Sequence, residues 1–211
     1  MKKILLAEGN IAEARDRSQV LSGFTQGERY AQVLRDLAPD LAVEVYNLPE
    51  LGPLPRSTLD GFDGVVLTGS ALQIYEDRPE VHRQIAFARD VFDAGMPFFG
   101  SCWGLQVATT AAGGEAALNH RGREIGFARR ITLTGAAQDH PLHRGRVGAF
   151  DAPAVHSVHV TRPAPGMIVT ATNAVSEVQG AEIRCGNGTF WGVQYHPEFT
   201  ISDLADVMLR Y

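Results

Sequence analysis

The sequence has few lysines and no long apolar run, and both scarcities exclude classes of protein. Lys2 and Lys3 are the only lysines among 211 residues, the arginines are dispersed, and the formal net charge is −5. The chain therefore has no basic stripe of the kind that binds nucleic acid. No apolar run is long enough to span a bilayer. The run at residues 4–6 is too short for a secretory leader and Glu8 interrupts it, so we interpret it as a first strand. We expect neither a nucleic-acid partner nor a membrane partner.

Cysteine is also scarce, since Cys102 and Cys185 are the only two. A disulfide between them would disable Cys102 as the nucleophile that we propose below, so we expect a reducing, cytoplasmic location. The hydrophobic content is 45%, which suits a sizeable core. No repeat, low-complexity tract or linker divides the sequence. We therefore predict that residues 1–211 form a single domain.

The order of the predicted elements indicates an α/β fold. In the first half, short apolar runs that suit strands alternate with stretches in which apolar residues have helical spacing. The apolar runs are at residues 3–7, 41–46, 65–67 and 98–99, and the stretches with helical spacing are at residues 29–37, 80–94 and 105–112. This alternation predicts a doubly wound, mostly parallel sheet. Residues 8–27 are polar and are expected to form a mobile loop with a short helix. The proline-rich residues 48–57 are expected to form a loop.

After Gly114 the pattern changes to successive strands. We predict strands at residues 129–134, 147–150, 155–160, 167–172, 178–185 and 190–195. Ser202 is expected to cap a last helix.

Cys102 lies in a context typical of a catalytic nucleophile. The apolar residues 98–99 lead into residues 100–106, which read G-S-C-W-G-L-Q, and an alanine-rich helical stretch follows. A strand, a tight turn and a helix with the reactive atom on the turn form a nucleophile elbow. The positive end of the helix dipole favours a thiolate there. A lone cysteine is more often a buried structural residue, but this context favours the catalytic interpretation.

A second segment supplies the other two groups of a nucleophilic triad. Residues 192–198 read G-V-Q-Y-H-P-E, so an apolar run ends in His196 and Glu198. His196 would take the thiol proton and later give it to the departing amine. Glu198 would orient the imidazole and stabilise its cation. Alone, His196 would also suit a structural, hydrogen-bonded role.

Amide hydrolysis also needs N–H donors for the tetrahedral oxyanion. The backbone N–H of Trp103, directly after the nucleophile, is one candidate. A backbone N–H of the turn at Gly69 and Ser70 is a second, because both turns lie at the carboxyl ends of parallel strands, where such sheets bind ligands. An ordinary turn is the alternative for Gly69 and Ser70.

Two histidine pairs suggest a metal site but lack a recognisable ligand pattern. His156 and His159 lie three residues apart, as do His140 and His143. The first pair falls in a predicted strand and the second brackets a proline, so neither forms a zinc pattern. We expect no metal and no other cofactor.

The two main motifs resemble those of class I glutamine amidotransferases, and the resemblance covers nearly the whole chain. Residues 100–106 match the family's G-x-C-x-G-x-Q elbow, and residues 192–198 match its G-V-Q-[FY]-H-P-E segment. The resemblance implies a flavodoxin-like α/β sandwich with a small antiparallel extension of the sheet, and hydrolysis of glutamine to glutamate and ammonia. It also implies which residues contact the α-amino and α-carboxylate end of glutamine, namely Gln106 and the backbone of Val155, His156 and Ser157.

Several interpretations of the activity remain open at this point. The ammonia would pass to a separate synthetase, or the chain would act alone as a γ-glutamyl peptidase. A non-catalytic regulatory or binding module and a thiol redox sensor are further alternatives. Ala71 stands where many relatives have a proline after the oxyanion turn, so we expect a looser loop there. Residues 8–27 are the expected specificity element.

Overall fold

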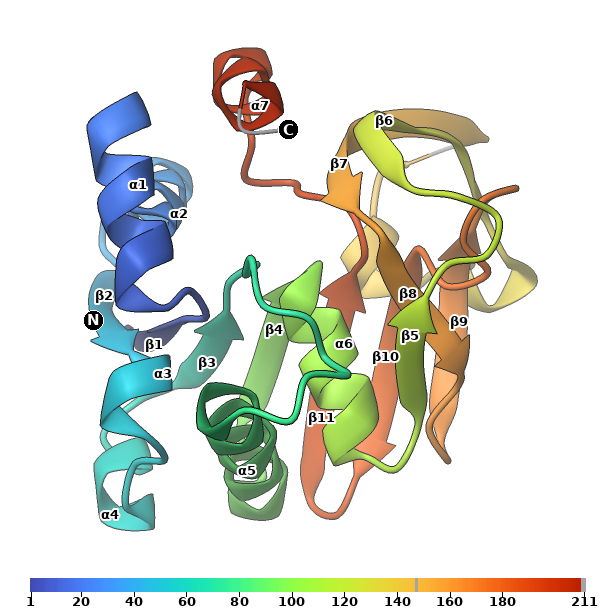
Figure 1. Ribbon diagram of the computed structural model, residues 1–211. Coiled ribbons are helices and arrows are strands. Elements are labelled where there is room, and N and C mark those ends of the chain that lie inside the picture. Colours follow the sequence, from blue (N-terminus) through green and yellow to red (C-terminus); the bar gives the residue numbers. More distant parts are fainter. Residues whose placement is uncertain (147, 210–211) are drawn as a thin grey trace.

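A nine-stranded sheet runs through the computed structural model, which describes residues 1–146 and 148–209 (Figure 1). The strand order is β2-β1-β3-β4-β11-β10-β9-β6-β7, and β5 and β8 form a separate ribbon. Helices and strands alternate along the first half, as the sequence pattern predicts. The predicted α/β fold class is therefore confirmed. Residue 147, at the start of the predicted strand 147–150, lies outside the described residues.

The first half of the sheet is parallel and has helices on both faces. Its strands are β2 (Ala42–Asn47), β1 (Lys3–Glu8), β3 (Gly64–Leu67), β4 (Pro97–Ser101) and β11 (Gly188–Val193). Side chains alternate between the faces, so Leu5 packs with α5 (Pro79–Ala94) and α6 (Trp103–Ala111). Leu6 packs with Tyr30 of α2 (Gln26–Leu37) on the other face. Two-sided burial explains why these strands are continuous apolar runs.

The second half of the sheet is antiparallel. Its strands are β10 (Gly180–Cys185), β9 (Met167–Thr172), β6 (Glu124–Leu133) and β7 (Ala149–His156), and the separate ribbon contains β5 (Glu115–Leu118) and β8 (Val158–Arg162). The predicted single strand at 155–160 is wrong, because Ser157 separates β7 from β8. The break occurs because β7 pairs with β6 whereas β8 pairs with β5. Two one-turn 3-10 helices, η1 (Gly135–Ala137) and η2 (Pro141–His143), follow β6.

Three local expectations need correction. Residues 8–27 contain the eleven-residue helix α1 (Ala12–Ser22), whose only buried residue is Ser18, so its sequence has little apolar periodicity. The expected loop at 48–57 contains α3 (Leu48–Leu51) and the start of α4 (Arg56–Leu59), each a single turn. Thr200 rather than Ser202 caps the last helix, because the N–H of Asp203 donates to Thr200 Oγ1 at 3.2 Å.

The last helix, α7 (Ile201–Met208), lies above the edge at which β4 and β11 end (Figure 1). It contacts α1, β6 and β7. Arg29 of α2 anchors it through an ion pair with Asp203, at 2.9 Å. The segment that joins β11 to α7 carries His196 and Glu198, so this topology brings them to the carboxyl edge of the parallel strands. In the described part of the chain, no helix has the length and apolarity needed to cross a membrane.

Candidate active site

Cys102 lies in a strained turn between β4 and α6. Its φ of 50° is unusual for a residue with a side chain. Glycines on both sides permit the turn, since a Cβ on Gly100 would come within 2.9 Å of Gly104 Cα, and a Cβ on Gly104 within 2.6 Å of Leu67 O. The N–H of Cys102 donates to Val193 O at 2.8 Å. This bond ties the elbow to the strand that leads to His196.

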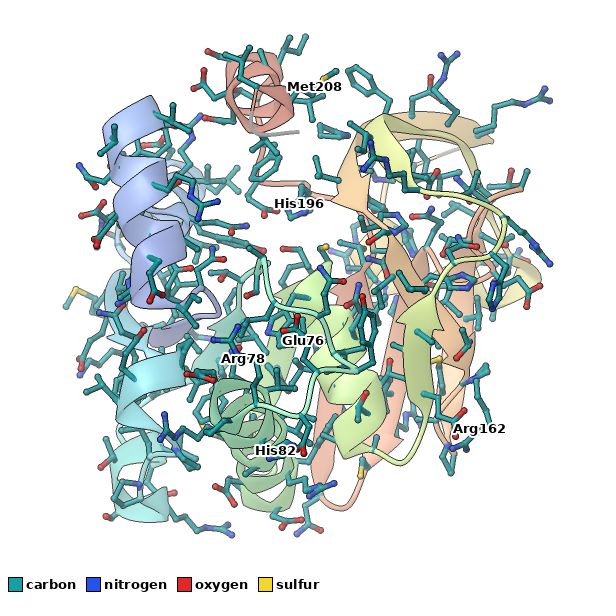
Figure 2. All side chains as sticks on the ribbon, viewed as in Figure 1. Glu76, Arg78, His82, Arg162, His196 and Met208 are labelled. Carbon is teal, nitrogen blue, oxygen red and sulfur yellow. The ribbon has the colours of Figure 1, made fainter. Side chains whose placement is uncertain are left out.

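The structure brings Cys102, His196 and Glu198 together, in the order that the sequence predicts. His196 Nδ1 lies 2.7 Å from Glu198 Oε1, and the Cys102 thiol is within hydrogen-bonding reach of the same imidazole. The three residues are 6%, 4% and 3% exposed, respectively. Phe199 stacks on the imidazole, with ring centroids 4.2 Å apart. Figure 2 shows His196 below α7, in the gap between α1 and β7.

The electrostatics of this group favour a cationic imidazole. Burial lowers the pKa of His196, but the Glu198 carboxylate and the Cys102 sulfur outweigh burial and raise that pKa to about 10. At neutral pH the imidazole therefore carries the proton that a departing amine needs. The Cys102 thiol also approaches Val155 O at 3.8 Å.

Two further residues, Ser101 and Tyr30, lie beside Glu198 and were not predicted as site residues. Ser101 Oγ donates to Glu198 Oε1 at 3.2 Å. Tyr30 lies beside Ser101 and Glu198, and burial, reinforced by the charge of Glu198, raises the pKa of its phenol. Tyr30 therefore stays neutral beside the carboxylate. Ser101 precedes the nucleophile and was within the elbow motif, but Tyr30 comes from α2 and reaches the site only through the fold.

The turn at Gly69 and Ser70 lies beside His196. A Cβ on Gly69 would come within 2.8 Å of His196 Cε1 and 2.7 Å of Gln26 Nε2, so the turn requires glycine there. Ser70 Oγ donates to Gly9 O at 2.8 Å, and Ser70 lines the cavity beside Cys102. Trp103 is the first residue of α6, so its N–H has no acceptor within the helix. The Trp103 indole donates to Gln84 Oε1 at 2.7 Å and packs in the core.

Ala71 holds the loop after this turn in place, contrary to the looser loop that we expected. Its N–H donates to Asn10 Oδ1 at 2.8 Å, a bond that proline cannot make. Asn10 is itself held, because its Nδ2 donates to Gln26 Oε1 at 2.8 Å and to the buried Glu8 at 3.1 Å. Burial raises the pKa of Glu8, and its hydrogen bonds offset part of that effect. Sequence reasoning missed Asn10 because its partner lies 61 residues away.

Of the four predicted substrate contacts, only Val155 lines the cavity at Cys102. Gln106 is buried, and its Nε2 donates to Val158 O at 3.2 Å. His156 is held between Val158 O and Glu124, and the Ser157 carbonyl accepts from Asn119 N at 2.8 Å. The role of these residues in binding substrate stays a prediction.

A second buried histidine–carboxylate pair supports the end of β7. His156 Nε2 lies 3.0 Å from Glu124 Oε2, which also accepts from Gln179 Nε2 at 2.6 Å. Asn173 Nδ2 donates to the other oxygen at 2.7 Å. Burial alone would raise the pKa of Glu124. These hydrogen bonds outweigh burial and lower that pKa below its usual value, so the carboxylate stays charged. Neither His156 nor Glu124 lines the cavity at Cys102.

A cavity of about 200 Å³ opens beside Cys102 and His196. Sequence reasoning named no single residue of its outer wall, although it expected residues 8–27 to contribute. That wall comes from the segment after β1, from α1 and α2, and from the chain around α7, through Asn10, Ala14, Arg17, Gln26, Phe199 and Val207. Three larger cavities among the described residues, of about 630, 480 and 400 Å³, contain none of the triad residues, so the chemistry and not the size of a cavity marks the site.

In the described residues, no group of three or more His, Cys, Asp and Glu side chains is arranged to hold a metal ion. Three of the four histidines in the two pairs bind other groups. His140 Nε2 lies 3.1 Å from Glu182 Oε2, and His143 Nε2 lies 2.8 Å from Thr170 Oγ1. His156 contacts Glu124 and Val158, as above.

Comparison with known sequences agrees with this geometry. The profile described as Glutamine amidotransferase class-I matches residues 28–210. The chain is 38% identical over 206 residues to a gamma-glutamyl-L-1-hydroxyisopropylamide hydrolase of Pseudomonas sp, over 96% of this chain and 70% of the relative. It is 28% identical over 185 residues to the glutamine-hydrolysing GMP synthase of Corynebacterium jeikeium, over 87% of this chain but 33% of the synthase.

Solved structures share the fold. A glutamine amidotransferase of Thermotoga maritima superposes with a TM-score of 0.75 at 19% identity, over 100% of this chain and 83% of the other. A glutamine amidotransferase of Methylobacillus flagellatus gives a TM-score of 0.72 at 18% identity, over 100% of this chain and 75% of the other. At these identities the likeness concerns the fold alone.

Proposed function

This chain belongs to the class I glutamine amidotransferase family, and we propose that it hydrolyses the side-chain amide of glutamine or of a γ-glutamyl amide through Cys102, His196 and Glu198. One observation carries the proposal, the buried group in which the thiol reaches the imidazole and the imidazole lies 2.7 Å from the carboxylate. The family and the γ-glutamyl amide hydrolase at 38% identity support a hydrolytic enzyme with a small-molecule substrate.

Acylation begins when the Cys102 thiolate attacks the carbonyl carbon of the side-chain amide, and the π electrons move onto oxygen. When the tetrahedral intermediate collapses, the C–N bond breaks and the His196 imidazolium donates its Nε2 proton to the departing nitrogen. Ammonia or an amine leaves, and a γ-glutamyl thioester remains on Cys102. Glu198 accepts from Nδ1, so it keeps Nε2 directed at the sulfur.

Deacylation uses the same groups in the opposite sense. His196, now neutral, takes a proton from water, and the hydroxide oxygen attacks the thioester carbon. The C–S bond then breaks, so glutamic acid is released and ionises in solvent. The thiolate and the imidazolium are restored together.

We assign the oxyanion to the backbone N–H of Trp103 and to the turn at Gly69 and Ser70. Loss of one donor of this kind typically lowers the rate by about 10²–10³-fold. The fixed position of the turn, through Ala71 and Asn10, supports preorganised donors. Charge that develops on the carbonyl oxygen is then stabilised without movement of the loop.

A stand-alone hydrolase of γ-glutamyl amides is the better supported form of this activity. The relative that acts on such an amide is the more similar in sequence, and this chain spans 70% of its length against 33% of a GMP synthase. The cavity wall formed by α1 and α7 also leaves room for a substituent on the amide nitrogen. The GMP synthase relatives support a second candidate, in which the ammonia passes to a separate synthetase.

A substrate survey tests the proposal. Glutamate and amine release would be measured for glutamine, γ-glutamyl amides and γ-glutamyl peptides, with and without candidate synthetases, for the wild type and Cys102→Ala. We expect glutamate from the wild type only. If no γ-glutamyl amide is a better substrate than glutamine, the stand-alone form is wrong. If the wild type releases no more glutamate than Cys102→Ala, a non-catalytic module is the correct interpretation.

A further inference from the structure

Arg17, an exposed residue of α1, lines the catalytic cavity and has no partner among the described residues, unlike two other arginines of this region. Arg15 pairs with Glu50 at 2.9 Å, and Arg29 pairs with Asp203 at 2.9 Å. Within residues 1–146 and 148–209, Arg17 makes no hydrogen bond or ion pair. Ala14 lies one helical turn before it on the same face of α1 and lines the same cavity. Among the described residues that line the cavity, Arg17 therefore supplies the one guanidinium, and it is free to bind a ligand.

Residues that line the same cavity as Arg17 indicate the side on which the amine departs. Phe199 stacks on the His196 ring and lines the cavity together with Val207 of α7. Because His196 donates the proton to the departing nitrogen, that nitrogen lies on the side of His196. Val155 contacts the thiol on another wall, at the end of β7. The part of the substrate beyond the scissile bond thus extends between α1 and α7.

Helix α7, on one side of this region, is anchored to α2. Asp203 Oδ2 accepts from Thr200 N at 2.7 Å and from Arg29 Nε at 3.0 Å, which anchors α7 to α2. The cavity beside Cys102 has a volume of about 200 Å³, which is below the roughly 300–1,000 Å³ of pockets that bind drug-sized ligands. Ala14, Phe199 and Val207 add a short apolar wall. A small amine with a short side chain fits this space.

We propose that Arg17 binds a carboxylate on the amine half of the substrate, so that the enzyme prefers γ-glutamyl derivatives of small amino acids to those of neutral amines. A guanidinium binds a carboxylate through two parallel hydrogen bonds, which gives both affinity and orientation. This inference rests on the proposed hydrolase function and names its substrate class. Arg17 acts here in specificity and leaves the chemical steps to the triad.

Three substrates of nearly equal size test the inference. γ-Glutamyl-alanine carries a carboxylate, γ-glutamyl-alaninol a hydroxyl, and γ-glutamyl-isopropylamide neither. The readout is the ratio of kcat/KM for the first to kcat/KM for the third, measured for the wild type, Arg17→Gln, Arg17→Lys and Arg89→Gln. Arg89 is exposed on α5, away from the cavity, so it is the matched control.

We expect the ratio to exceed one in the wild type and to fall about 10- to 100-fold in Arg17→Gln, as for the loss of a hydrogen-bonded charge pair. The fall should appear mainly in KM, Arg17→Lys should restore part of the ratio, and Arg89→Gln should keep it. An unchanged ratio in Arg17→Gln overturns the inference. This includes the case in which kcat/KM falls by the same factor for both substrates. A wild type that hydrolyses glutamine but not γ-glutamyl-alanine overturns it while the proposed function stands. A wild type that releases glutamate from none of them refutes the proposed function itself.

Discussion

Replacement of Glu198 by glutamine should shift the alkaline limit of activity by several pH units. The amide oxygen can still accept from His196 Nδ1 and Ser101 Oγ, so the shape of the site is kept and only the charge is lost. Two charges about 4 Å apart interact by about 4 kcal/mol at an effective dielectric constant of about 20. At about 1.36 kcal/mol for each pKa unit, this corresponds to roughly 3 units.

The direction of the shift follows from the negative charge that the substitution removes from beside His196. In the wild type the Glu198 carboxylate is the foremost group that raises the pKa of His196, to about 10, against the effect of burial. Without it the pKa of His196 falls toward about 7. The imidazole then loses the proton for the leaving group at a lower pH, and the alkaline limb of the rate profile moves down with it.

The assay is kcat/KM for one γ-glutamyl substrate as a function of pH, from about pH 6 to about pH 10. Glu124→Gln is the matched control, since Glu124 is also a buried carboxylate paired with a histidine, at 3.0 Å, but outside the cavity. We expect Glu198→Gln to move the alkaline limb and Glu124→Gln to leave it in place. An unmoved limb in Glu198→Gln, or an equal movement in both variants, would refute the role of the carboxylate in holding the proton on His196.

Three further predictions concern the loop, the thiols and α7. Ala71→Pro removes the N–H that donates to Asn10, so we expect kcat to fall about tenfold with little change in KM, and a wild-type kcat would contradict the anchor. A glutamine-like electrophile should label Cys102 before the more exposed Cys185, and peptide mass spectrometry showing equal labelling would mean that Cys102 is not activated. Hydrogen bonds from Thr200 and the charge of Arg29 outweigh burial and hold the pKa of Asp203 below 3.8, so its stabilisation is present above that pH and is lost as pH falls through the lowered pKa. Arg29→Gln should therefore lower Tm at pH 7 but have much less effect in strong acid, and a Tm loss that is the same at both pH values would refute this ion pair as its cause.

The parts of the site that lie in contiguous motifs could be predicted from the sequence. The elbow at Cys102 depends on glycines two residues before and after it, and these are visible in one short segment. His196 and Glu198 are two residues apart, so their pairing is also local. Their approach to Cys102 follows from the parallel pairing of β4 and β11, which brings the carboxyl ends of both strands to one edge of the sheet.

The rest of the site depends on contacts between distant residues or on weak local patterns. Asn10 meets Ala71 across 61 residues, and no motif marks Asn10. Helix α1 buries only Ser18, so the apolar spacing that reveals α2 is missing there, and Arg17 could not be placed at the cavity. The break at Ser157 arises because β7 pairs with β6 in one sheet and β8 pairs with β5 in another. A single apolar run in the sequence does not show that its two halves belong to different sheets.

The most direct test of the mechanism is the mass of the enzyme itself during turnover. Wild-type protein mixed with a γ-glutamyl substrate would be quenched in acid after a short time, digested and analysed by mass spectrometry. We expect a γ-glutamyl thioester on the peptide that contains Cys102, and none in Cys102→Ala. Release of glutamate by an enzyme that never carries this adduct, or that carries it on Cys185, would contradict Cys102 as the nucleophile.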